Sequence, residues 1–204
     1  MADGEVAYPS QTRYAAHVTP FLDSSELRGA VYPVSVGFYH EASRLGMIGE
    51  DVELLEGVIF RKMAKSPLHE WLIEFFKRHL EAVCGPGYFV GKERPITCAR
   101  SEPEPDLAVF SGDWTDYKDH HPTTAALVVE ISINTQVRDL GKAAIYAEAG
   151  VLEYWLVEPE AGRITIHSEP SGSEYGKVVV VAKGETAVGT VFPALAVRVD
   201  EVSR

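Results

Sequence analysis

The fold is decided by the stretch AALVVEISI at residues 125–133, which is nearly continuous in apolar residues. Such a run is typical of a central strand that is buried on both faces. A helical pattern at residues 137–149 follows and ends at Gly150, and residues 153–157 read as another strand. This strand–helix–strand order predicts a parallel, right-handed βαβ unit in a mixed α/β domain.

The clearest helix lies upstream, where Ser66 is suited to the N-cap and Pro67 to the first helical position. Gly85-Pro86-Gly87 ends it. Apolar residues at i, i+3, i+4 and i+7 spacing predict the face that packs on the core: Leu68, Trp71, Leu72, Phe75, Phe76, His79, Leu80 and Val83.

The remaining pattern completes a mixed sheet with flanking helices. Residues 1–33 carry little periodicity, and we expect a loosely ordered arm there, followed by a single domain at residues 34–204. The shorter expected elements are a helix at 34–45, a hairpin over 51–63 that turns at Glu56-Gly57, a turn at 170–173, and strands at 88–90, 107–110, 164–167 and 177–181.

The composition limits the partners and the compartment. The 204 residues carry a formal net charge of −11, which disfavours phosphate backbones overall. Residues 61–99 are the exception, with seven basic and four acidic side chains. The N-terminus is polar, apolar runs are short, and the two cysteines, Cys84 and Cys98, match no metal motif. We expect a cytoplasmic protein with no membrane partner and reduced thiols, although a disulfide between the two cysteines stays open.

Two acidic residues on expected core strands are the first candidates for chemistry. A carboxylate inside a run of Leu, Val and Ile, such as Glu130, is costly to bury unless it is paired or binds a cation. Asp106 follows Pro105 at the start of another strand. If these strands are neighbours, the two carboxylates suit a hard cation such as Mg²⁺. A salt bridge or a strand end at the surface would explain Glu130 equally well.

Lys142 is the third candidate. It shares one helix face with Asp139 and Tyr146, and the first turns of that helix should lie near the carboxyl end of the Glu130 strand. The competing interpretation is a solvated surface lysine. The chain has no G-x-S-x-G, G-x-G-x-x-G or P-loop motif. His120-His121 lies in a polar loop in which we expect no matching acidic or sulfur ligand for a metal.

These residues resemble the Uma2 family of restriction-endonuclease-like proteins. The likeness runs from about residue 34 to about residue 200, and it is carried by Val128-Val129-Glu130-Ile131-Ser132, Arg138-Asp139, Lys142, Tyr146, Gly150-Val151, residues 153–159, residues 53–57, His69 and Glu104-Pro105-Asp106-Leu107. The resemblance implies a PD-(D/E)XK nuclease fold: a four-stranded mixed sheet with flanking helices, here with an N-terminal extension and extra C-terminal strands.

The resemblance also implies roles for these residues. Asp106 and Glu130 would be the two acids and would hold Mg²⁺ or Mn²⁺, with the backbone carbonyl of Ile131. The usual lysine two residues after the acid is Ser132 here, so Lys142 would be a migrated lysine. Glu56 and His69 match further family positions and are additional site candidates, and His69 is equally compatible with a packed core histidine.

The implied activity is metal-assisted hydrolysis of DNA phosphodiester bonds, in which Lys142 would position or help deprotonate the attacking water. The implied partners are DNA and a second copy of the chain, with no organic cofactor. Two alternatives stay open. One is an inactive relative that binds nucleic acid or protein. The other is an assembly module that uses Trp155 and the C-terminal strands as its interface.

Overall fold

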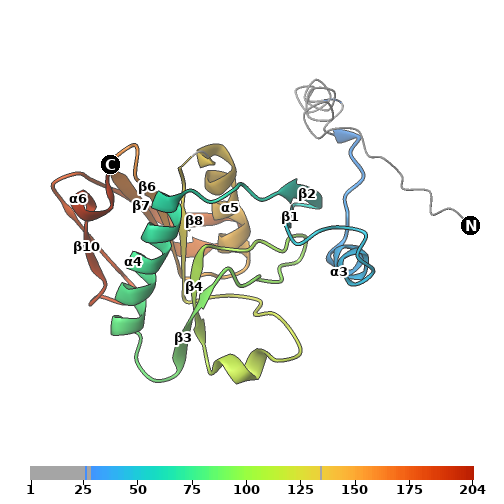
Figure 1. Cartoon of the computed structure of the whole chain (residues 1–204), viewed down its shortest axis with the longest axis horizontal. Helices are drawn as coiled ribbons and strands as arrows, with labels where there is room; N and C mark the ends of the chain where they lie inside the picture. Colours follow the sequence, from blue (N-terminus) through green and yellow to red (C-terminus); the bar gives the residue numbers. More distant parts are fainter. Residues whose placement is uncertain (1–25, 27–28, 134) are drawn as a thin grey trace, which may run out of the picture. The chain divides into compact units, whose positions relative to one another are not determined.

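The structure is a computed structural model that describes residues 26, 29–133 and 135–204 (Figure 1). The chain divides into two units, residues 1–33 and 34–204. The expected arm at residues 1–33 falls almost entirely outside the described residues. Within the described part of the chain, no helix has both the length and the apolar character needed to cross a membrane.

The second unit is built on a six-stranded mixed sheet with the order β3-β4-β5-β6-β7-β8. Only the β5–β6 pair is parallel, as the βαβ pattern predicts, and every other pair is antiparallel. The strands are β3 (Tyr88–Lys92), β4 (Leu107–Ser111), β5 (Leu127–Ile131), β6 (Glu153–Glu158), β7 (Arg163–Ser171) and β8 (Glu174–Ala182). The four strands that the resemblance implies are therefore extended by the long C-terminal hairpin β7–β8.

Helices and two small hairpins surround this sheet. The hairpins are β1 (Val52–Leu55) with β2 (Val58–Arg61), and β9 (Thr186–Val188) with β10 (Ala196–Arg198). The helices are α3 (Val36–Arg44), α4 (Pro67–Val83), α5 (Gln136–Glu148) and α6 (Val199–Val202), with a 3-10 turn, η1, at Trp114–Tyr117. The β9–β10 hairpin, α6 and η1 lack a clear periodic signal in the sequence, because each strand or helix there has only three or four residues.

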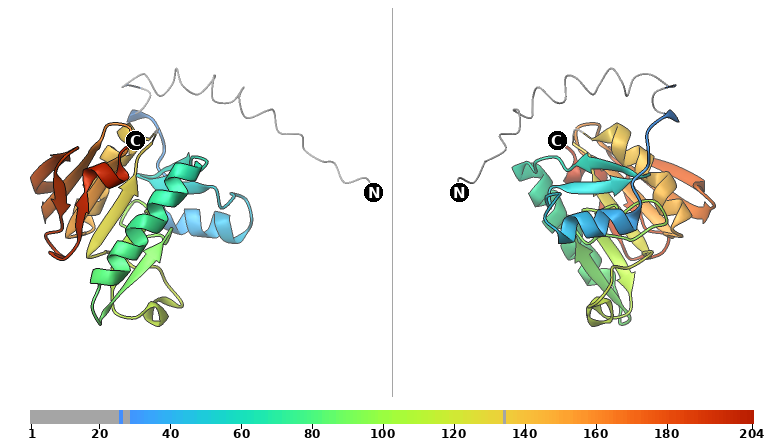
Figure 2. Two further views of the ribbon diagram at one scale, coloured as in Figure 1. Left: turned by 60° about the vertical axis from the view of Figure 1, so that its left-hand side comes forward. Right: turned by 90° about the vertical axis from the view of Figure 1, so that its right-hand side faces the viewer.

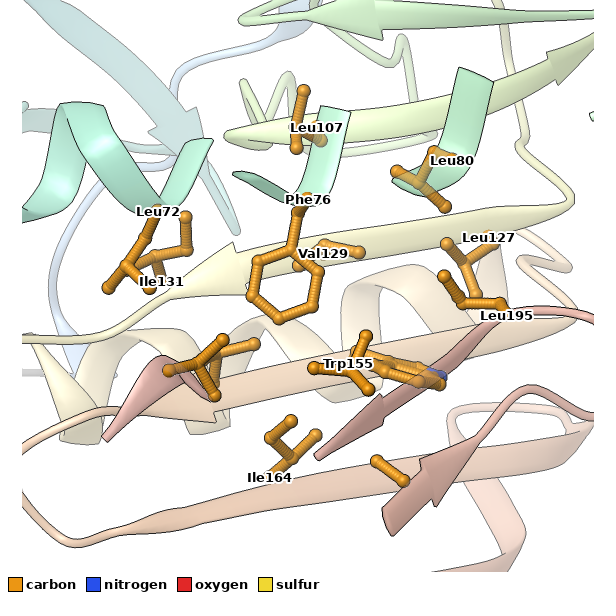
Figure 3. Packing of buried hydrophobic residues seen from close by; sticks show 14 of the residues in the cluster. Leu72, Phe76, Leu80, Leu107, Leu127, Val129, Ile131, Trp155, Ile164 and Leu195 are labelled. Atoms are coloured by element: carbon orange, nitrogen blue, oxygen red, sulfur yellow. The ribbon is translucent and has the colours of Figure 1, made fainter. Parts of the chain in front are cut away.

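The α4 helix covers one face of the sheet, on the opposite side from α5 (Figures 1 and 2). Ser66 caps α4 as expected, since its hydroxyl accepts a hydrogen bond from the backbone N–H of His69. Phe76 lies over the sheet and meets Trp155 edge to face, with ring centroids 6.4 Å apart (Figure 3). The buried side chains of α4 are Leu72, Ile73, Phe76 and Leu80.

The predicted apolar stripe of α4 is wrong at one edge. Trp71 is 53% exposed and stacks on Phe75 at 5.4 Å, whereas Ile73, which lies outside the predicted stripe, is buried. The buried face is rotated toward Ile73 because Leu72, Ile73 and Phe76 meet the sheet directly. Hydrophobic spacing alone could not separate these two neighbouring orientations.

The α5 helix presents its polar residues to the protein interior. Asp139, Lys142 and Tyr146 are buried, whereas Leu140 is 48% exposed. The interpretation of Lys142 as a solvated lysine is therefore wrong.

Trp155 is fully buried on β6, so it cannot form the interface of an assembly module as one alternative required.

We predict that Phe76→Ala lowers the free energy of unfolding by about 3–5 kcal/mol, because it leaves a cavity between α4 and the sheet. Trp71→Ala, on the exposed side of the same helix, should cost about 1 kcal/mol or less. Urea unfolding of both variants measures the difference. Equal costs would mean that α4 packs in the orientation of the apolar stripe.

Candidate active site

A pocket of about 230 Å³ opens where the start of β4 and the end of β5 meet the starts of α4 and α5. Its walls are strongly charged. The acidic residues that line it are Glu53, Glu93, Glu104, Asp106, Glu130 and Asp139, and the basic ones are Lys62, Lys65, Arg138 and Lys142, with His69 beside them. The excess of carboxylates makes this a place that favours a bound cation.

Asp106 and Glu130 lie near each other at one end of the sheet, because Asp106 directly precedes β4 and Glu130 lies on the neighbouring strand β5. The antiparallel register pairs Leu107 with Val129, so each acid is one residue beyond that pair, and both line the pocket. The Oδ2 atom of Asp106 also accepts a hydrogen bond of 2.8 Å from the backbone N–H of Ile131. The structure thus brings together both acids of the predicted pair.

Lys142 reaches the same place from α5. Its Nζ lies 2.9 Å from Oε1 of Glu130 and 2.9 Å from Oε2 of Glu53, and its side chain is only 3% exposed. The hydroxyl of Tyr146 donates to the same oxygen of Glu130 at 2.7 Å. Glu130 is therefore held by two donors from one helix face, and this fixes the orientation of its carboxylate.

Sequence reasoning missed Glu53 as a site residue. It lies on β1, is 2% exposed and contacts Lys142 directly. The signal was present, since Val52-Glu53-Leu54-Leu55 places a carboxylate inside an apolar strand just as the Glu130 stretch does. Arg138 adds a second cation, with Nε 3.6 Å from Oε1 of Glu53 and Nη1 donating to the backbone carbonyl of Arg61.

Glu56 is not brought to this pocket. It sits at the β1–β2 turn with a backbone φ of 48°, pairs with Arg100 and Ser101, and lines a second pocket with Glu148. The expectation that it joins Asp106 and Glu130 is therefore not met. Glu56 lies three positions after Glu53, and this offset moves the carboxylate from the strand interior to the exposed turn.

His69 does point toward the site. Its Nε2 lies 3.2 Å from Oδ2 of Asp106, while its Nδ1 is buried with no hydrogen-bond partner among the described residues. Burial alone would lower the pKa of His69, but the hydrogen bond to Asp106 and the charge of that carboxylate outweigh it and raise the pKa. His69 is thus poised to donate to Asp106 near neutral pH.

The buried ionisable groups of the pocket change one another's pKa values. Desolvation raises the pKa of Glu130, and the negative charges of Asp106, Asp139 and Glu53 add to this while Lys142 opposes it. Burial would lower the pKa of Lys142, but the carboxylates around it raise it instead. Lys142 therefore holds its proton at neutral pH, which suits charge stabilisation better than proton removal from water.

The donor set fits a magnesium ion with few protein ligands. All the contacts of Asp106 use Oδ2 and all those of Glu130 use Oε1, so one oxygen of each carboxylate has no hydrogen-bond partner among the described residues. Mg²⁺ commonly takes one or two carboxylates and keeps several waters. No group of three or more His, Cys, Asp or Glu side chains in residues 29–133 and 135–204 forms a complete metal cage.

A second polar cluster surrounds Glu102. Nε2 of His40 lies 2.9 Å from its Oε1 and Nε2 of His121 lies 3.8 Å from the same atom. The expectation that His121 has no acidic neighbour is wrong, because chain folding brings in residues that are distant in sequence. Among the residues that the structure describes, His40, Glu102 and His121 do not form a group that could hold a metal ion.

Comparisons with known proteins point in one direction. The sequence model of the Uma2 family, described as a putative restriction endonuclease, matches residues 44–200. A crystal structure described as a putative nuclease belonging to DUF820, from Anabaena variabilis, is similar with a TM-score of 0.65 and 15% sequence identity. The match covers 83% of this chain and 97% of that chain, and it confirms the expected nuclease-like fold. No curated protein matches the chain.

We predict that Lys142→Met lowers the free energy of unfolding by about 3–5 kcal/mol, because it leaves buried carboxylates without their cation. Lys77→Met, which removes an exposed lysine from α4, is the matched control and should be nearly neutral. Urea titration at pH 7 measures both. A loss no larger than that of the control would mean that Lys142 is not the buried counter-ion.

We also predict that Glu130→Gln makes stability less dependent on pH. The raised pKa means that the folded state binds this proton more tightly than the unfolded chain does. The contribution of Glu130 to stability is therefore present at acidic pH and is lost as the pH rises above the usual glutamate range. Unfolding measured at several pH values should show a shallower decline in the variant, and an unchanged decline would contradict the pKa shift.

Proposed function

Because the chain belongs to the Uma2 family, we propose that it is a metal-dependent endonuclease that hydrolyses phosphodiester bonds in DNA. The observation that carries the proposal is that Asp106 and Glu130 line one charged pocket with Lys142, which lies 2.9 Å from Glu130. Phosphoryl transfer depends chiefly on positioning and on stabilising negative charge, and this set of groups suits both tasks.

Asp106, Glu130 and the backbone carbonyl of Ile131 are the proposed ligands of Mg²⁺ or Mn²⁺. When bound, the ion would supply Lewis acidity and lower the pKa of a bound water. The residues of the chain would do the rest. Tyr146 and Lys142 hold Glu130 in place, and His69 with the Ile131 N–H orients Asp106.

Lys142 is proposed to stabilise charge rather than to act as the base. Its two carboxylate partners keep it protonated. Of the two roles expected from the sequence, positioning of the attacking water is therefore favoured over its deprotonation. A protonated amine within reach of the phosphate would offset the negative charge that develops in the transition state.

We predict that the purified protein nicks plasmid DNA in Mg²⁺ or Mn²⁺ and not in EDTA. Asp106→Asn and Glu130→Gln should abolish cleavage, because each removes a proposed metal ligand, and Lys142→Ala should reduce it by about 10²- to 10³-fold. Glu56→Gln, in the second pocket, is the control and should stay active. A gel assay with melting curves of each variant gives the readout.

Cleavage that persists in all three site variants, with contaminating nucleases excluded, would overturn the proposal. Binding of DNA without cleavage under any divalent ion would instead favour the inactive relative that binds nucleic acid or protein. A homodimer and a cytoplasmic location stay predictions. A dimer would let two sites act on the two strands of a duplex.

A further inference from the structure

We propose that Lys62 and Lys65, on the rim of the pocket, form a clamp for backbone phosphates that Glu104 and Glu93 mask until nucleic acid displaces them. The inference rests on the proposed function, because it assumes a polynucleotide substrate. It adds how the substrate is held and why an acidic protein can hold it. We refer to the two lysines as the rim lysines.

The rim lysines belong to the segment that joins β2 to α4. Nζ of Lys62 lies 2.9 Å from Oε1 of Glu104, and Nζ of Lys65 lies 2.5 Å from Oε1 of Glu93. All four side chains line the same pocket as Asp106. Lys65 also lies 4.0 Å from Oε1 of Glu70, and Glu93 is shared with Lys92 at 3.3 Å. The positive charge of each rim lysine is therefore offset by neighbouring carboxylates.

These ion pairs differ from the pair at the centre of the site. The side chains of Lys62 and Lys65 are 28% and 33% exposed, whereas that of Lys142 is 3% exposed. Partly exposed pairs contribute little to stability, and a lysine on its flexible stem can exchange one anion for another. A phosphate can therefore compete for the rim lysines, while Lys142 stays with Glu130 and Glu53.

The interior of the pocket makes such a clamp necessary. Glu53, Asp106, Glu130 and Asp139 give it more negative charge than Lys142 and Arg138 offset. A phosphate backbone that approaches this interior is repelled unless cations meet it at the mouth. The rim lysines are the cations in the right place, and they lie within the one positive segment of the chain, residues 61–99.

Masking gives the clamp a preference for extended polyanions. A ligand with a single phosphate draws one rim lysine away from its carboxylate partner, and that carboxylate then lies unpaired beside the phosphate. A backbone with several phosphates engages both rim lysines at once, so the second contact is made by a ligand that is already bound. The clamp thus favours a polynucleotide over a free nucleotide.

The test measures binding apart from cleavage. The Asp106→Asn protein is titrated into a fluorescent DNA duplex at several salt concentrations, and binding is measured by fluorescence anisotropy. The same titrations are made with double variants that carry Lys62→Ala, Lys65→Ala or Glu104→Gln in addition to Asp106→Asn. Each lysine variant should weaken binding several-fold and reduce the slope of log K against log salt by about 0.9, the effect of one lost phosphate contact. Glu104→Gln should tighten binding, because it unmasks Lys62.

Lys77→Ala is the matched control. Lys77 is 36% exposed, pairs with Glu81 on α4 at 3.6 Å and does not line the pocket, so its loss should leave the slope unchanged. If Lys62→Ala and Lys65→Ala behave like Lys77→Ala, or if Glu104→Gln weakens binding or leaves it unchanged, the masked clamp is wrong and the proposed function survives. If the Asp106→Asn protein binds no DNA at low salt, both proposals fail.

Discussion

A buried ammonium group with two carboxylates is the constraint on which the rest of the site depends. Lys142 lies between Glu130 on β5 and Glu53 on β1, and it comes from α5. Burying any of these charges alone would be prohibitive, so the three elements must approach in one arrangement. This arrangement fixes the pocket, since the start of α5, the start of β4 and the end of β5 are its walls.

The same constraint gives the pocket its electrostatic character. One lysine cannot neutralise Glu53, Asp106, Glu130 and Asp139 together. Burial raises the pKa of Glu130, and the negative charges of the other three carboxylates add to that rise. A divalent cation would relieve it. The net charge of −11 is thus partly a property of the site, and it makes the masked rim lysines important for approach of a polyanionic substrate.

The strand–helix–strand core could be predicted from the sequence because its signals are local. The apolar run at residues 125–133 indicates a buried strand, and the cap residues of α4 mark the ends of a helix, each without reference to the rest of the chain. Glu130 and Asp106 could also be predicted as site residues from the sequence, since a carboxylate beside buried strand residues is unusual wherever it occurs. The burial of Lys142 could not be predicted from its helix alone, because it depends on the carboxylate partners that β1 and β5 bring to this lysine.

The misassignments share this origin. Glu53 and Glu56 differ by three residues, and only the observed hairpin shows which one faces the pocket. Trp71 and Ile73 flank Leu72 on α4, and tertiary packing rather than periodicity selects Ile73 for the core. Contacts such as His40 with Glu102 join residues far apart in the chain.

The central claim is that Asp106 and Glu130 together hold a divalent cation beside Lys142. Anomalous diffraction from a crystal soaked in Mn²⁺ tests it most directly. We expect a manganese peak between the two carboxylates that is lost in Asp106→Asn. No peak at that position under saturating Mn²⁺, or a peak only at the His40–Glu102–His121 cluster, would contradict it.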